Sequence, residues 1–334
     1  MTKKKRQMRK RPEKAGQLHT RWSGLDSVVT PGGQRFKRFY TLETLRRALD
    51  FALAGKGNDT FVRPALAQLL TGGAISLAEF QPAYEDHYRF VLRATVSTQR
   101  RRQGVGALVV AKNDAEFSTL VEGEFGHLKQ LAQRAPGLVA VPLRAGAIAL
   151  PDRHARSGRV RLVSAYLRKT LDDAQPLGVA PGGQFTLAAL RPHRFSVADT
   201  EHLKARLAEL VLRAFDPAAG TMPDLDALEP TDFLVTRAKE ARPKLKLAAC
   251  RHMRSRQTPA ACFAALLNAK WPAGQTRTHL VPQDPDLLVP ALARAVGKTT
   301  AARWAGEYLA AVAAKKAPPC RSDYLDALEH FVVK

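Results

Sequence analysis

Hydrophobic positions early in the chain recur at the spacing of a helix. Four leucines would share one helical face: Leu42, Leu45, Leu49 and Leu53. Thr41 is a candidate N-cap, although Thr44 stands where the acid or amide of a complete capping box belongs. A second short helix is expected over residues 64–70. We therefore interpret residues 21–83 as a helical lead-in.

From Tyr84 onward the hydrophobic period shortens toward two, which is typical of strands. Strands are predicted over residues 88–96, 106–112, 139–143 and 159–166, and a helix is predicted over residues 116–134. A second helix is expected over residues 199–215, where Asp199, Thr200 and Glu201 supply an acidic start and a cap.

A strand hairpin is predicted within residues 231–256. Its two strands are Asp232-Phe233-Leu234-Val235 and Leu245-Lys246-Leu247-Ala248-Ala249, with a polar turn between them. After Thr258 the chain is mostly helical, with one helix expected over residues 299–315. Strands, a helix, more strands and then helices indicate an α+β fold with two lobes, which we assign to residues 84–170 and 171–334.

The composition indicates a folded chain without a transmembrane segment. Hydrophobic residues make up 45% of the 334 positions, which is enough for a substantial core. No apolar run approaches the roughly 20 residues that cross a bilayer, and no apolar segment follows the N-terminal charges. The three cysteines form no CxxC pair, so we expect free thiols in a reducing, cytoplasmic setting.

Basic residues exceed acidic ones by a wide margin. The chain has 53 Lys+Arg against 30 Asp+Glu, a net charge of +23. Residues 1–14 contribute +7, from eight bases and one acid, so +16 remains on the other 320 residues. We interpret residues 1–20 as a disordered basic arm. The surplus favours a polyanion such as nucleic acid, anionic lipid at a membrane surface or a phosphorylated glycan, although an arginine-rich composition without functional meaning is the alternative.

Three groups of bases are the candidate polyanion-binding residues. The arm contributes Lys3, Lys4, Lys5, Arg6, Arg9, Lys10 and Arg11. The turn between the first two predicted strands contributes Arg100, Arg101 and Arg102, and the segment after the hairpin contributes Arg251, Arg254 and Arg256. Binding through such residues should weaken steeply with salt.

The hairpin and the elements before it resemble the protein-kinase-like fold, and more narrowly the lipopolysaccharide-core kinases and the aminoglycoside phosphotransferases. In those families one strand follows the catalytic loop, and a second, of the form L-K-L-I-D, delivers the metal-binding Asp. Leu245-Lys246-Leu247-Ala248-Ala249 has that shape. The resemblance covers about residues 85–330 and implies a two-lobed fold with a helical N-terminal extension, with ATP and Mg²⁺ as cofactors.

The same resemblance implies three nucleotide-binding residues. Lys112, which ends Val109-Val110-Ala111-Lys112, takes the place of the strand lysine that holds the α- and β-phosphates. Glu124 takes the place of the helix acid that pairs with this lysine, and Glu122 competes for the role. Tyr166 lies in the strand that resembles the one leading to the adenine-contacting hinge.

The chain departs from the family where catalysis occurs. Ala249 falls where the metal-binding Asp is expected, and no His is followed two residues later by an Asp. Asp226 is the candidate catalytic base, with Asp224 as a second choice and a plain turn role as the alternative for both. Asp232 is the other catalytic candidate and the candidate metal ligand, but a single carboxylate makes a poor Mg²⁺ site.

Three functions follow from these observations. The leading hypothesis is a catalytically degenerate kinase-fold protein, a pseudokinase, that acts as a regulator or scaffold through a protein or polyanion partner. The first alternative is an active ATP-dependent kinase of a small molecule or lipopolysaccharide with an altered catalytic loop. The second is a basic nucleic-acid-binding protein. The sequence leaves the oligomeric state open.

Overall fold

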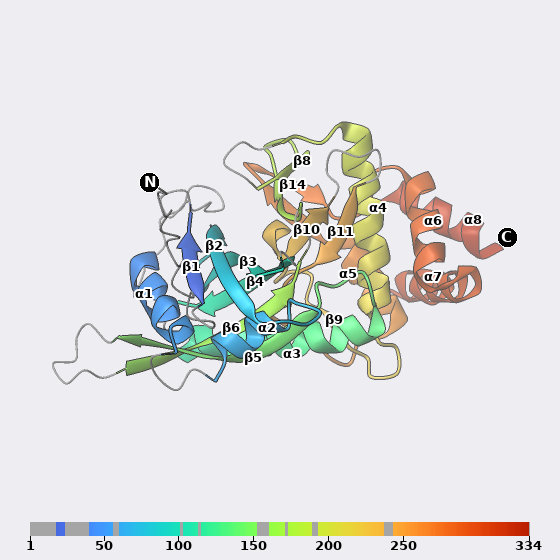
Figure 1. Cartoon of the computed structure of the whole chain (residues 1–334). Coiled ribbons are helices and arrows are strands. Elements are labelled where there is room, and N and C mark those ends of the chain that lie inside the picture. The colour runs from blue at the N-terminus through green and yellow to red at the C-terminus, as the bar shows by residue number, and fades with distance from the viewer. Residues whose placement is uncertain are drawn as a thin grey trace, which may run out of the picture.

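The computed structural model describes residues 18–23, 40–55, 60–100, 103–112, 115–151, 160–170, 173–188, 193–236 and 243–333. The predicted α+β class is confirmed: a mixed sheet with its helices precedes a part of the chain that is mainly helical (Figure 1). Residues 1–17 of the basic arm, together with Arg101 and Arg102, lie outside the described residues. The last residues of the expected disordered arm are ordered instead, because the strand β1, His19–Trp22, begins there. In the described ranges, no helix is long and apolar enough to span a membrane.

Six strands form the main sheet, in the spatial order β1-β2-β3-β4-β6-β5. Their bounds are β1 His19–Trp22, β2 Ile75–Glu85, β3 Arg89–Thr98, β4 Gln103–Ala111, β5 Pro142–Pro151 and β6 Val160–Lys169. β1 runs parallel to β2, and the other neighbours are antiparallel. The strand expected over 139–143 therefore starts later than predicted and runs much further.

The expected helical lead-in also contains strands. Most of β2 lies within residues 21–83, which we expected to be helical. Buried residues alternate along it at Ala78, Phe80, Pro82 and Tyr84. A proline and a small alanine on the buried face conceal the two-residue period in the sequence. The first helix of this stretch forms as predicted: it is α1, Leu42–Leu53, and the Thr41 hydroxyl accepts from the Thr44 N–H. The second, expected over residues 64–70, is α2, Val62–Ala67, which begins and ends earlier.

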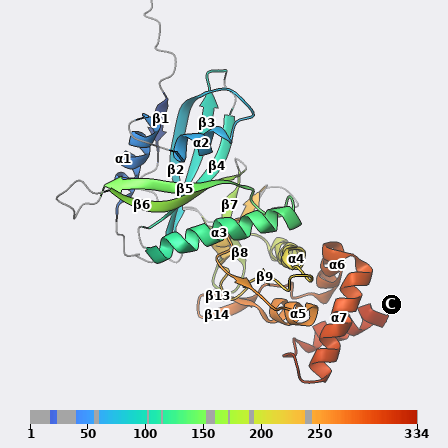
Figure 2. The same ribbon diagram turned by 90° about the horizontal axis from the view of Figure 1, so that it is seen from below.

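Helices cover both faces of the sheet. On one face α1 and α2 pack on Phe90, Leu92 and other residues of the same core cluster. Gly146 on this face meets Phe61 so closely that an added Cβ would lie 2.6 Å from the ring, which explains the glycine. On the other face lies α3, Ala115–Arg134, between the sheet and the C-terminal helices (Figure 2).

The remaining chain builds a four-stranded sheet and a set of helices. The predicted hairpin is confirmed as β10, Phe233–Thr236, paired antiparallel with β11, Lys244–Leu247. β7, Gln175–Val179, and β8, Phe185–Leu187, extend this sheet. The helices are α4 Val197–Ala214, α5 Pro259–Asn268, α6 Pro285–Val296, α7 Lys298–Ala313 and α8 Ser322–Val333.

Three short features complete this part. η2, Pro230–Asp232, leads into β10, and the two-residue strands β9, Met222–Pro223, and β12, Met253–Arg254, pair with each other. A hairpin of β13, Lys270–Ala273, and β14, Thr276–His279, interrupts the region that we expected to be mostly helical.

Backbone hydrogen bonds join the two parts of the chain beside the hairpin. The Leu247 N–H donates to the Leu138 carbonyl at 2.9 Å, and the Ala140 N–H donates to the Leu247 carbonyl at 2.8 Å. His127 of α3 bonds through Nδ1 to the Cys250 carbonyl at 2.9 Å. The end of β11 is thereby held against α3 and the segment that leads into β5.

Candidate functional site

The centre of the candidate site is Arg89, at the start of β3. Its side chain is fully buried and binds three carboxylates. Nε donates to Asp86 Oδ2 at 2.9 Å, Nη2 donates to Asp232 Oδ1 at 2.8 Å, and Nη1 donates to Glu124. The guanidinium also lies 4.8 Å from the centroid of the Tyr88 ring. Burial lowers the pKa of Arg89, but the attraction of Glu124 and its neighbours outweighs burial, and the pKa ends well above its usual value.

The tight turn between β2 and β3 sets the position of Arg89. Asp86 Oδ1 accepts from the backbone N–H groups of Tyr88 and Arg89, at 3.1 and 3.0 Å. Its other oxygen accepts from the Arg89 side chain. One carboxylate therefore fixes both the turn and the arginine that follows it.

Glu124 reaches the site from α3. Besides Arg89, it accepts hydrogen bonds from the Tyr88 hydroxyl, at 2.7 Å, and from the Tyr166 hydroxyl of β6. Burial raises the pKa of both tyrosines well above the usual value, so each phenol keeps the proton that it donates. The partner of Glu124 that the resemblance implied was Lys112; the structure supplies Arg89.

Asp232 enters from the other side, at the end of η2. Oδ2 accepts from the Glu229 N–H at 2.8 Å and from Arg251 Nη2 at 2.9 Å, while Oδ1 accepts from Arg89. Arg251 also donates to the Ala227 carbonyl at 2.6 Å and pairs with Glu229. Asp232 therefore links the sheet to the chain that follows the hairpin.

Lys112 lies at the edge of the same group. Its amine donates to the Asp86 carbonyl, lies 3.7 Å from Glu85 Oε2, and sits 5.0 Å from the Phe90 ring centroid. Arg168 of β6, also buried, donates to the Ala248 carbonyl. We call the set of eight buried side chains the Arg89 network: Glu85, Asp86, Arg89, Lys112, Glu124, Arg168, Asp232 and Arg251. Its four cations and four carboxylates balance.

The donor set does not fit Mg²⁺-ATP. A metal ion needs carboxylate oxygens, but those of Glu124 and Asp232 are hydrogen-bonded to arginines, tyrosines and a backbone N–H. Ala249 stands where a metal-binding Asp was expected; it is fully buried, and its N–H donates to the Asp232 carbonyl at 3.1 Å. Within the ranges given above, no group of three or more His, Cys, Asp or Glu side chains could hold a metal ion.

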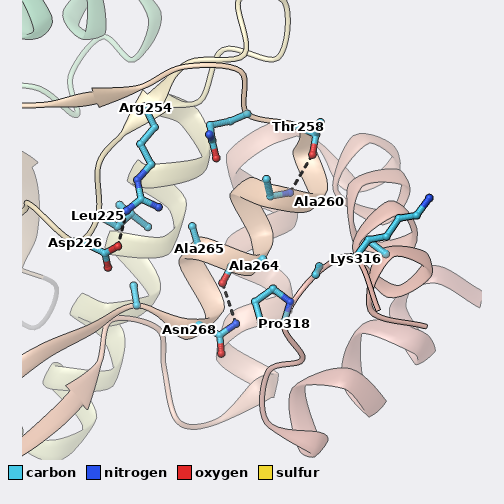
Figure 3. A pocket seen from close by; sticks show the side chains of 15 residues that line it. Leu225, Asp226, Arg254, Thr258, Ala260, Ala264, Ala265, Asn268, Lys316 and Pro318 are labelled. Carbon is cyan, nitrogen blue, oxygen red and sulfur yellow. Dashed lines mark hydrogen bonds and ion pairs between the residues drawn. The ribbon is translucent and has the colours of Figure 1, made fainter. Parts of the chain in front are cut away.

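Asp226 lies apart from the Arg89 network. Its side chain is 77% exposed and pairs with Arg254 at 2.5 Å, and Arg254 also pairs with Asp224 at 2.8 Å. Asp226 and Arg254 lie at one end of a pocket of about 530 Å³ (Figure 3). Alanines of α5, such as Ala264 and Ala265, line the pocket wall. Asp224 Oδ1 accepts from the Asp226 N–H at 3.2 Å, as in a turn.

The expected cluster of Arg251, Arg254 and Arg256 does not form. Arg251 is buried within the Arg89 network, Arg254 is bonded to two aspartates, and Arg256 is exposed in a left-handed backbone conformation, φ 57°. Arg100 is exposed at the turn before β4. The three arginines after the hairpin therefore do not form one accessible surface.

We did not predict Arg89, Asp86 or Arg168 as site residues from the sequence. The sequence did contain an indication of the role of Arg89. Arg89 begins an apolar strand and lies on the same face as Val91, two residues later, which packs in the core beneath α3. A charged residue at an inward strand position needs a buried partner. A scan of models of known protein families matches none of them to this chain, and a search of curated proteins finds no match either.

Proposed function

We propose that this protein is a catalytically degenerate member of the kinase-like fold, a pseudokinase, that acts as a regulator or scaffold. The observation that carries the proposal is the threefold pairing of Arg89 with Asp86, Glu124 and Asp232. In the kinase-like interpretation, Glu124 and Asp232 lie where a nucleotide and its metal ion would be bound, and here they bind an arginine of the same chain.

The order and pairing of elements support the kinase-like part of the proposal. β4, which Lys112 directly follows, precedes the helix with Glu124, and β6, which contains Tyr166, pairs with β4. α4 and the β10–β11 hairpin then follow in the order that the resemblance requires. Glu124 and Asp232, far apart in the sequence, meet at one guanidinium.

Electrostatics argue against catalysis at this centre. Phosphoryl transfer depends on cations aimed at the phosphates and on carboxylates that hold Mg²⁺. Moving Arg89 aside to admit a nucleotide would leave three buried carboxylates without their shared counter-charge, a cost of several kcal/mol. The centre is therefore better suited to holding the two parts of the chain together than to binding a phosphate.

Thermal-shift titration with ATP, with and without Mg²⁺, tests this proposal. We expect no saturable rise in Tm in either series, because the carboxylates of Glu124 and Asp232 are already bound to Arg89. A Mg²⁺-dependent rise that saturates, and that Lys112→Ala removes, would contradict it. ATP turnover that Asp226→Asn abolishes would favour the active-kinase alternative instead, because Asp226 lies outside the Arg89 network.

A polyanion-binding role is a second candidate. The Arg89 network is neutral, so the whole surplus of +23 falls on the rest of the chain. Filter binding of double-stranded DNA at a series of salt concentrations tests it. We expect the logarithm of the binding constant to fall linearly with the logarithm of the salt concentration. Affinity that salt leaves unchanged, or no binding at low salt, would remove this candidate.

A further inference from the structure

Three arginines converge on one buried glutamate between α4 and α6. Glu209 is 4% exposed, and its Oε2 accepts from Arg206 Nη1 at 2.9 Å and lies 3.5 Å from Arg294 Nε. Its Oε1 pairs with Arg213 Nη2, also at 2.9 Å. Arg213 Nη2 further donates to the Arg294 carbonyl at 3.0 Å, which ties α4 to α6. We call Arg206, Glu209, Arg213 and Arg294 the Glu209 cluster.

The cluster carries more positive charge than Glu209 neutralises. Three guanidinium groups face one carboxylate whose two oxygens are both engaged. The three arginines are 40%, 38% and 48% exposed, so part of each guanidinium, with its five N–H donors, faces solvent. A second anion would meet donors whose orientation Glu209 already fixes.

The helices α4 and α6 lie side by side (Figure 1). A pocket of about 290 Å³ beside the cluster is lined by residues of both helices. Arg206 and Arg294 line it together with Pro290 and Asp286. Within the described residues, the Asp286 carboxylate has no hydrogen-bond or ion-pair partner. The pocket thus combines cationic donors with one exposed carboxylate as an acceptor.

We propose that this pocket binds a small organic phosphate that carries hydroxyl groups. Arg206 and Arg294 would donate to the phosphate, since guanidinium groups match phosphate geometry. Asp286 would accept from the hydroxyls. With three arginines against Glu209 and Asp286, the net charge of the site is +1. This small positive charge favours an anion with a hydroxylated end over a polyanion without hydroxyl groups. The site is separate from the Arg89 network and does not depend on the function proposed above.

Titration calorimetry with glycerol 3-phosphate, inorganic phosphate and glycerol, in a buffer free of phosphate, tests the proposal on the full chain. We expect glycerol 3-phosphate to bind several-fold more tightly than phosphate, and glycerol not to bind. Arg294→Gln should weaken glycerol 3-phosphate at least tenfold. Asp286→Ala should remove the preference over phosphate while tightening phosphate itself, because a repulsive charge is lost.

Arg303→Gln is the matched control. Arg303 lies on α7, is 67% exposed and pairs with Glu307 at 3.9 Å. It does not line the pocket, so its removal lowers the net charge equally without changing the pocket. We expect it to change affinity less than twofold. No saturable binding up to about 10 mM, a weak-affinity limit near 3 kcal/mol, would overturn the proposal. Equal losses in Arg294→Gln and Arg303→Gln would also overturn it. Should Arg294→Gln lower Tm, Arg206→Gln serves as the second variant, with the same tenfold expectation.

Discussion

The Arg89 network and the Glu209 cluster use the same chemistry in opposite ways. Both pair arginines with carboxylates from different elements of the chain. In the network, cations and carboxylates balance and water is excluded; in the cluster, three arginines share one glutamate and remain partly exposed. Buried charged groups must therefore be neutralised by one another, whereas a site that binds an anion needs cationic groups that the protein does not neutralise.

Desolvation explains this difference. An ion taken out of water costs several kcal/mol, and only partners fixed in good geometry repay that cost. At the surface the cost is small, and so is the gain. A buried centre thus commits its charged groups to each other, and a surface cluster can keep donors for an outside anion.

The largest expected effect comes from removing Arg89. Arg89→Met would leave Asp86 and Glu124 buried without the arginine that pairs with them, and Asp232 with Arg251 alone. We therefore expect a loss of about 3–5 kcal/mol in the free energy of unfolding. Urea denaturation followed by circular dichroism measures it. Arg303→Met, an exposed arginine with one distant partner, is the control and should change stability by less than about 0.5 kcal/mol. Similar losses in both variants would erase the contrast between the regions.

Alkaline pH should destabilise the protein through the two tyrosines that donate to Glu124. Burial raises the pKa of Tyr88 and Tyr166 well above the usual value of 10.0, so their protonated forms stabilise the folded state fully below that value. As pH rises above it, only the unfolded chain releases these protons and stability falls. Unfolding at increasing pH, read with tyrosinate absorbance, tests this. Tyr166→Phe should reduce the slope, and an unchanged slope would argue against buried phenols.

The smallest effect is expected at the exposed pairs of Arg254. Asp226 is 77% exposed and Arg254 is 35% exposed, so solvent screens their attraction. Arg254→Gln should lower the free energy of unfolding by no more than about 1 kcal/mol. The same urea titration measures it. A loss as large as that of Arg89→Met would mean that the Asp224–Asp226 segment belongs to the structural centre.

Local patterns in the sequence predicted much of the fold. Leucine spacing located α1, two-residue alternation located β3 and β4, and the short apolar runs around a polar turn located the β10–β11 hairpin. β2 was not predicted, because Pro82 interrupts its two-residue alternation of apolar side chains. These elements depend on neighbours in the chain, which is why periodicity finds them.

The candidate site was harder to predict because its pairings are distant in sequence. Glu124 and Asp232 were identified through the kinase resemblance, but Arg89 lies 143 residues from Asp232 and no periodicity links them. We predicted Asp226 from its position in the loop before the hairpin. The pairing of β12 with β9 brings Arg254 to this loop, and Asp226 pairs with Arg254. The Glu209 cluster likewise depends on how α6 packs against α4.

A double-mutant cycle on Arg89 and Asp232 tests the central claim most directly, namely that Asp232 serves Arg89 rather than a nucleotide's metal ion. The free energies of unfolding of Arg89→Met, Asp232→Asn and the double variant are measured by urea denaturation and compared with the unmodified chain. We expect the double variant to be less destabilised than the sum of the two single variants by about 1–3 kcal/mol. Additivity within about 0.5 kcal/mol would contradict the claim.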